Sequence, residues 1–168
     1  MAKKAQFKIN DYVVYPTHGV GKIINEETQS IGGHELRVFV IDFEKDKMTL
    51  RVPVNRAEAA GLRHISSAED IIKAFDTLKG RAKKSRGMWS RRAQEYEAKI
   101  NSGDLISIAE VVRDLHRNVD QAERSYSERI IYESALSRLI GELAAARSID
   151  SKSAEVELMQ VLKAQAAA

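Results

Sequence analysis

The chain has 168 residues, enough for one ordinary domain or two small ones, and its hydrophobic and charged fractions of 43% and 30% exclude general disorder. It contains no cysteine, which excludes disulfides, thiol catalysis and zinc-ribbon sites and suits the cytoplasm. No run approaches the roughly 20 apolar residues that cross a bilayer, and the basic N-terminus leads into no apolar segment of a secretory signal.

The net charge of +3 is concentrated in one part of the chain. Residues 81–100 hold seven basic and two acidic side chains, a net of +5, whereas residues 101–168 hold eight and eleven, a net of −3. Residues 81–92 hold six of these basic side chains, no acidic one and the only tryptophan, Trp89. Because local basic clusters indicate polyanion partners better than total charge does, this block predicts a nucleic-acid contact.

The first 55 residues predict a small, strongly bent β module. Four β-like runs, rich in β-branched and aromatic residues, cover residues 7–16, 22–28, 35–43 and 48–54. The glycines between the runs, which fit turns that need positive φ, are Gly19, Gly21, Gly32 and Gly33.

The fourth run alternates in the manner of a half-buried strand. Met48, Leu50 and Val52 face one way, and Thr49 and Arg51 face the other. Pro53 cannot donate a ladder hydrogen bond and therefore fits a strand end or edge. We expect this run to be an edge strand with Arg51 on its polar side.

From Ser66 onward the apolar spacing is that of helices, and five are expected. Residues that fit helix N-caps, two of them in capping-box matches, are Ser67, Asp104, Ser125 and Asp150. The remaining helix covers about Met88 to Ile100, preceded by a basic connector at residues 81–87. We therefore predict an α+β protein with a β module at residues 1–55, a linker at 56–65 and an all-α five-helix domain at 66–168.

The residues indicate neither catalysis nor a metal or cofactor site. The four histidines, which show no ligand spacing, are His18, His34, His64 and His116. Gly19-Val-Gly21 is too short for a phosphate-binding loop, and no serine lies in a nucleophile elbow. We expect a protein that is not an enzyme and uses no cofactor.

A series of motifs in one order resembles the bacterial CarD/CdnL transcription regulators over residues 7–165. The matching segments are Asp11-Tyr-Val-Val-Tyr-Pro-Thr-His-Gly-Val-Gly21, Met48-Thr-Leu-Arg-Val-Pro-Val54, Gly61-Leu-Arg63, Trp89-Ser-Arg-Arg92, Ser102-Gly-Asp104, Ala109-Glu-Val-Val-Arg-Asp-Leu115 and Glu142-Leu-Ala144. The resemblance implies an N-terminal Tudor-like (SH3-like) β-barrel that binds the β subunit of RNA polymerase. It also implies a helical domain that touches promoter DNA at the upstream edge of the transcription bubble and stabilises the open complex.

Trp89 has two interpretations. Trp89, Ala93, Tyr96 and Ile100 share one helix face, which favours burial in a core. The resemblance instead assigns this tryptophan to a wedge against an unstacked base step. The two roles are compatible if one ring edge is packed and the other is exposed.

The basic residues also have two interpretations, a solvated surface or contacts with DNA phosphates. Six basic side chains without an acidic one, beside a lone tryptophan, favour phosphate contacts, which position a protein without reading sequence. The residues expected to bind DNA are Trp89, Arg81, Lys83, Lys84, Arg86, Arg91, Arg92 and, from the resemblance, Arg129.

The resemblance makes Arg51 a polymerase contact, and a free strand edge beside it would allow β-augmentation. Thr49 lies on the same face, and Gln29 stands where the family often has an arginine. The expected partners are thus the RNA polymerase β subunit and promoter DNA, bound by a monomer without sequence preference. The alternative is a general nucleic-acid or ribosome-associated module, since small bent β domains also occur in translation factors.

Overall fold

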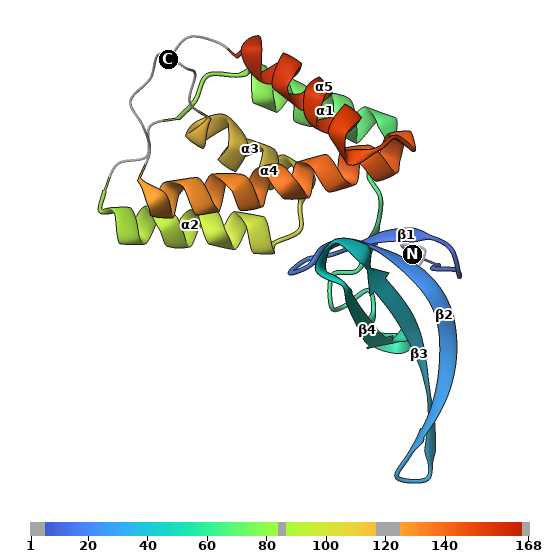
Figure 1. The fold of residues 1–168 in the computed structure, drawn as a ribbon. Coiled ribbons are helices and arrows are strands. Elements are labelled where there is room, and N and C mark those ends of the chain that lie inside the picture. Colours follow the sequence, from blue (N-terminus) through green and yellow to red (C-terminus); the bar gives the residue numbers. More distant parts are fainter. Residues whose placement is uncertain (1–5, 84–86, 117–124, 166–168) are drawn as a thin grey trace. The chain divides into compact units, whose positions relative to one another are not determined.

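The computed structural model describes residues 6–83, 87–116 and 125–165 of the chain (Figure 1). The chain divides into two compact units, Met1–Ile65, which is built from strands, and Ser66–Ala168, which is built from helices. The predicted α+β class, with a β module before a helical module, is confirmed.

Unit 1 (Met1–Ile65) is an antiparallel sheet with the strand order β4-β3-β2-β1-β5. Its strands are β1 (Tyr12–Tyr15), β2 (Gly19–Ile31), β3 (His34–Phe43), β4 (Met48–Pro53) and β5 (Arg63–His64). Two 3₁₀ turns, η1 and η2, cover Glu44–Asp46 and Val54–Arg56. In the described part of the chain the two-residue β5 pairs with β1 alone, so the sheet is open, whereas the resemblance implied a closed barrel.

One face of the sheet carries the core of unit 1, and β4 has the predicted alternation. Val52 is buried and Met48 and Leu50 pack against the same cluster, while Thr49 and Arg51 are exposed. The order of strands makes β4 an edge, as Pro53 predicted.

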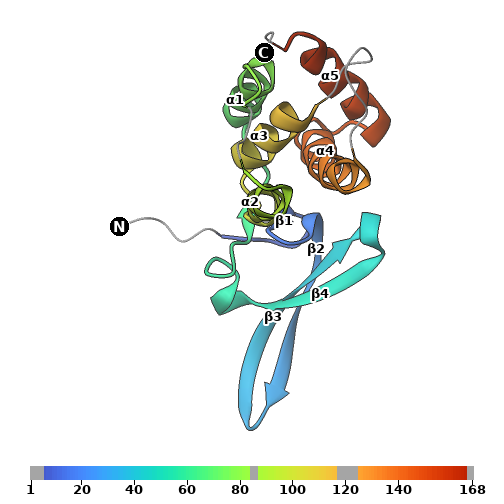
Figure 2. The same cartoon turned by 90° about the vertical axis from the view of Figure 1, so that its left-hand side faces the viewer.

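Strands β2 and β3 extend beyond the core as a two-stranded arm (Figure 2). β4 pairs only with Val38–Phe43 of β3, so residues 28–31 and 34–37 pair only with each other and form the arm. A register shift between Ile23 and Asn25 marks a bulge in β2 shortly before the arm, and bulges bend strands. This bulge accounts for the predicted bend of the module.

Gly21 is a strand residue and not the turn residue that the sequence predicted. The turn glycines Gly19, Gly32 and Gly33 do have positive φ. Gly21 lies in β2, where a Cβ atom would approach Ile41 Cγ2 to 2.7 Å and Phe43 Cε1 to 2.8 Å. Close packing under two core side chains therefore requires glycine at this position.

Residues 56–65, expected to be a linker, belong to unit 1. Ala57 and Leu62 are 1% and 3% exposed and complete its core, and β5 pairs with Val13 and Val14. Gly61, with φ of 92°, packs on Pro16, so the segment turns back onto the sheet. The helical unit therefore follows β5 directly.

Unit 2 (Ser66–Ala168) packs its helices around α3. The helices are α1 (Ala68–Lys79), α2 (Trp89–Asn101), α3 (Leu105–Leu115), α4 (Tyr126–Arg147) and α5 (Ser151–Lys163). α3 contacts α1, α2 and α4, and Ala109, Val111 and Val112 on α3 are fully buried.

The predicted N-caps are confirmed at four helices. Each cap side chain accepts a hydrogen bond from the backbone N–H three residues later, and the caps are Ser67, Asp104, Ser125 and Asp150. The pKa of Asp150 is lowered because the hydroxyl and then the backbone N–H of Ser153 donate hydrogen bonds to its carboxylate. These local signals fix the beginnings of α1, α3, α4 and α5.

A hydrogen bond between residues far apart in the sequence also fixes the beginning of unit 2. Glu142 of α4 is only 3% exposed, and its carboxylate accepts a hydrogen bond of 2.9 Å from the backbone N–H of Ser66. Ser66 directly precedes the cap of α1, so this bond ties the beginning of the helical unit to the C-terminal half of α4.

We predict that Gly21→Ala destabilises unit 1 by about 1–3 kcal/mol, because a methyl group overpacks the space under Ile41 and Phe43. Hydrogen exchange of the strand amides measures the loss. Thr28→Ala, an exposed change on the same strand, is the matched control and should alter stability by less than about 0.5 kcal/mol. The unfolding midpoint from the fluorescence of Trp89, which reports on unit 2, should not change. Wild-type protection of the strands in Gly21→Ala would contradict the packing argument.

Candidate nucleic-acid interface and polymerase-binding face

The beginnings of α2 and α4 lie side by side in unit 2 (Figure 1). Trp89, the first residue of α2, donates a hydrogen bond of 3.1 Å from its indole Nε1 to the Oγ of Ser127 in the first turn of α4. Both helices therefore present their N-terminal ends at one place. The positive ends of two helix dipoles meet there.

The ring of Trp89 is partly buried and partly exposed. It packs against the core cluster of the helical unit, and its centroid is 6.3 Å from that of Tyr96, one of the buried residues of α2. The core interpretation thus holds for part of the ring. The remaining surface is exposed at the N-terminal end of α2.

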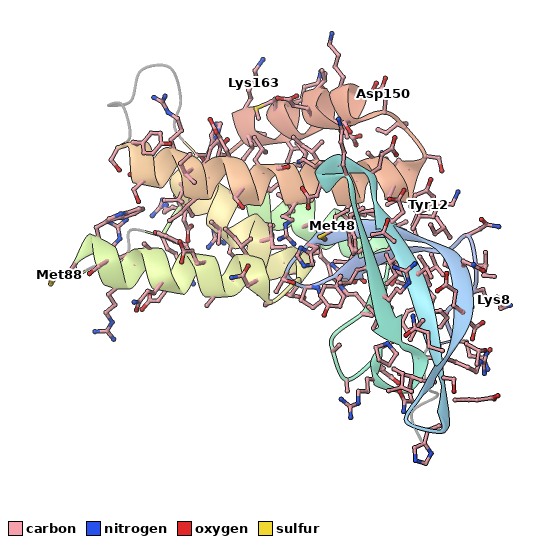
Figure 3. The ribbon with its side chains drawn as sticks, turned by 60° about the horizontal axis from the view of Figure 1, so that its bottom comes forward. Lys8, Tyr12, Met48, Met88, Asp150 and Lys163 are labelled. Atoms are coloured by element: carbon pink, nitrogen blue, oxygen red, sulfur yellow. The ribbon has the colours of Figure 1, made fainter. Side chains whose placement is uncertain are left out.

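Three exposed apolar side chains lie at the beginnings of these two helices. Met88 and Tyr126 are each 78% exposed and Ile130 is 47% exposed. Figure 3 shows Met88 projecting from the beginning of α2. Tyr126 and Ile130 were not predicted from the sequence, although their i, i+4 spacing sets them apart from the buried stripe that begins at Ile131.

The predicted basic residues fall into different environments. Arg81 and Lys83 are exposed in the connector, and the carboxylate of Asp114 accepts a 2.9 Å hydrogen bond from the backbone N–H of Lys83. Arg129 is exposed in the first turn of α4, three residues after Tyr126. The predicted contacts Lys84 and Arg86 lie outside the described residues.

Arg91 and Arg92 are neighbours in sequence but differ in burial. The Arg91 side chain is 82% exposed and lies 3.7 Å from Glu95. Arg92 is half-buried, and its guanidinium carbon is 5.4 Å from the centroid of the Trp89 ring and 6.0 Å from that of Tyr96. The sequence predicted the same role for both, and only Arg91 has the exposure of a surface cation.

The N-terminus of α2 differs from the four capped helices. Its N-cap, Met88, makes no side-chain hydrogen bond to the first turn. The first backbone N–H groups of a helix have no partner within it, and such groups bind phosphate in many proteins. At α2 no side chain of the N-cap competes with an anion.

The residues predicted to bind polymerase share one face of the sheet. Arg51 pairs with Val40, Thr49 with Asp42 and Gln29 with Leu36, and these pairs point to the face opposite the core. The Nε of Arg51 is 3.2 Å from the carboxylate of Glu27, across β3. From Thr49 to Gln29 the face extends over six residue steps along β3, from Asp42 to Leu36, about 20 Å at about 3.3 Å per step.

Two family models match the chain, and their limits follow the two units. The CarD-like/TRCF RID domain matches residues 7–66, and the CarD C-terminal domain matches residues 73–159. The chain belongs to the CarD/CdnL family. Members of the CarD/CdnL family are transcription regulators, and the RID type of N-terminal domain is one that interacts with RNA polymerase.

Two individual proteins are similar to the chain in sequence. The chain is 27% identical to "Putative transcription factor YdeB" of Bacillus subtilis (strain 168) over 146 residues, 87% of this chain and 95% of that protein. It is also 27% identical to the 72-residue N-terminal domain of Myxococcus xanthus CarD, solved by NMR, over 38% of this chain and 84% of the solved one, with a TM-score of 0.31.

Residues 6–83, 87–116 and 125–165 contain no cluster of histidine and acidic side chains that could hold a metal ion. Within those ranges no helix of this CarD/CdnL member has the length and apolar character of a membrane span.

Proposed function

We propose that this CarD/CdnL member binds the β subunit of RNA polymerase through unit 1 and promoter DNA through unit 2, and that it stabilises the open complex at the upstream edge of the bubble. The observation that carries the proposal is the partly exposed Trp89, anchored at a positive, uncapped helix N-terminus. We further propose that it acts in the cytoplasm as a monomer.

The DNA contact follows from the chemistry around Trp89. An apolar ring can lie against a base pair that has lost its stacking neighbour, which would oppose closure of the bubble. Since Ser127 occupies the indole N–H, the ring offers stacking and no base-specific hydrogen bond. Arg91, Arg129 and the connector would bind phosphates on either side of the ring, again without reading sequence.

The polymerase contact would form at the β4 edge. A partner strand could add to this edge by β-augmentation, and Arg51 beside it would meet an acidic group. Arg51 already pairs with Glu27, but both side chains are at least a third exposed, and such surface pairs contribute little to stability. An acidic partner could therefore replace Glu27 at small cost.

The two contacts support each other. Docking on polymerase raises the local concentration of unit 2 near the bubble, so a weak DNA contact suffices. This dependence on polymerase distinguishes the proposed function from that of a general nucleic-acid or ribosome-associated module, which would act without polymerase.

We predict that Trp89→Ala keeps polymerase binding but shortens the lifetime of the open complex about tenfold, the equivalent of about 1.4 kcal/mol and within the range for one stacked base. The measurement is the decay of open complexes at a slow promoter after addition of a competitor. Gln94→Ala, an exposed change on the same helix, should behave as wild type. Full activity of Trp89→Ala would exclude the wedge.

Tyr126→Ala should leave the thermal stability of unit 2 unchanged, because the side chain is 78% exposed. It should weaken binding to a fork-junction DNA by about threefold to tenfold, as expected for loss of one stacking or apolar contact. Binding to fully paired DNA of the same length is the comparison and should change less. Equal losses on both DNAs would argue against a role at unpaired bases.

Arg51→Glu should weaken binding to the isolated β subunit about tenfold or more, because it places like charges opposite each other. Arg37→Glu provides the matched control, since Arg37 is exposed and ion-paired with Glu26 but faces away from Arg51 on the sheet. Pull-down or titration compares the two. If both reversals weaken binding equally, the contact does not depend on the Arg51 face.

A further inference from the structure

We infer that Arg92 is a positioning residue that holds the Trp89 ring in one orientation, and that it is not one of the phosphate contacts. The inference rests on the proposed function and deepens it. Two adjacent arginines with the same predicted role thus have different roles, and Arg91 is the phosphate contact of the pair.

Helix geometry places Arg92 between two rings. It follows Trp89 by three residues and precedes Tyr96 by four, so the three side chains share one face of α2. The guanidinium carbon is within about 6 Å of both ring centroids, the range of a cation–π contact. One terminal nitrogen of the guanidinium also donates to the Tyr96 hydroxyl at 3.5 Å.

The burial of Arg92 argues against a phosphate contact. Its Nε is buried, and among the described atoms it has no hydrogen-bond acceptor. An unsatisfied buried donor lowers stability. Its retention favours a role in packing against the two rings, which an arginine surrounded by solvent could not fill. Arg91 has the opposite character, because its side chain is 82% exposed and is paired only loosely with Glu95.

The ring is held from a second helix as well. Ser127 on α4 accepts the indole hydrogen bond, while Arg92 and Tyr96 contact the ring from α2. Contacts from two helices leave the indole little freedom to change rotamer. A ring fixed before it meets DNA loses less entropy on insertion, which strengthens a small contact.

The first experiment uses the fluorescence of Trp89 in the free, full-length protein, where it is the only tryptophan. Arg92→Ala and Ser127→Ala should each raise the acrylamide quenching constant about twofold and lower the anisotropy, because the ring gains rotamer freedom on the ps–ns timescale. Arg91→Ala is the matched control and should keep wild-type values. Wild-type quenching and anisotropy in Arg92→Ala would overturn the inference.

The second experiment measures the salt dependence of DNA binding. Arg91→Ala should reduce the slope of log K against log salt by about one, as expected for loss of one phosphate contact, whereas Arg92→Ala should reduce it by much less. An equal reduction in both variants would overturn the inference.

Arg92→Lys preserves the charge and helix propensity if Arg92→Ala misfolds. It should retain the slope and still free the ring, because lysine cannot stack as a planar group.

The two experiments separate this inference from the proposed function. If Trp89→Ala leaves the open-complex lifetime unchanged, the wedge is excluded, yet the fluorescence of Arg92→Ala still decides whether Arg92 holds the ring. If Arg92→Ala frees the ring and open complexes then decay several-fold faster with an unchanged salt slope, both the role of Arg92 and the proposed function are supported.

Discussion

The hydrogen bond from the Trp89 indole to the Ser127 hydroxyl joins the beginnings of α2 and α4, and the candidate nucleic-acid interface depends on this contact. The two residues are 38 positions apart, so the packing of α2 and α4 with α3 must first bring them together. The bond satisfies the only polar group of a half-buried ring, which buried indoles generally require. Tyr126 lies in the same helix turn as the acceptor.

The exposed apolar groups at this end of unit 2 are costly unless they have a partner. Met88 and Tyr126 are both 78% exposed, and grouped apolar surface usually marks a binding site. Arg129 lies three residues after Tyr126 in the first turn of α4, and its exposed positive charge would attract a polyanion. Stacking groups within a basic frame suit unpaired bases flanked by phosphates better than they suit a protein partner.

The parts of the fold that depend on local chemistry were predictable from sequence. The four N-caps, the Gly32-Gly33 turn and the alternation in β4 each depend on residues close together in the chain. The failures share a different cause. β5 has two residues and exists because Leu62 and Ala57 fill the core under β1 and β2, a long-range effect without periodicity. Nothing in the sequence around Gly21 distinguishes a tightly packed strand glycine from a turn glycine.

For the candidate site, too, only the features that depend on residues close together in the chain were predictable. Charge and the lone tryptophan predicted a candidate interface, but they did not separate Arg91 from Arg92, because a count of basic residues ignores which helix face each occupies. The three residues predicted for the other partner, Arg51, Thr49 and Gln29, do share one sheet face, since alternation along strands is a local rule.

The proposed division of labour follows from what each surface can recognise. The ring and the cations near it would bind DNA without reading bases, because the indole N–H is already occupied and phosphates are the same at every position. Such a surface alone would be distributed over the whole chromosome. Position must then come from the other unit, through a protein found at the fork, and the weak, sequence-neutral contact becomes an advantage because it operates at any promoter. A surface with a higher affinity for DNA would act against this arrangement, because it would hold the protein on DNA at positions away from polymerase.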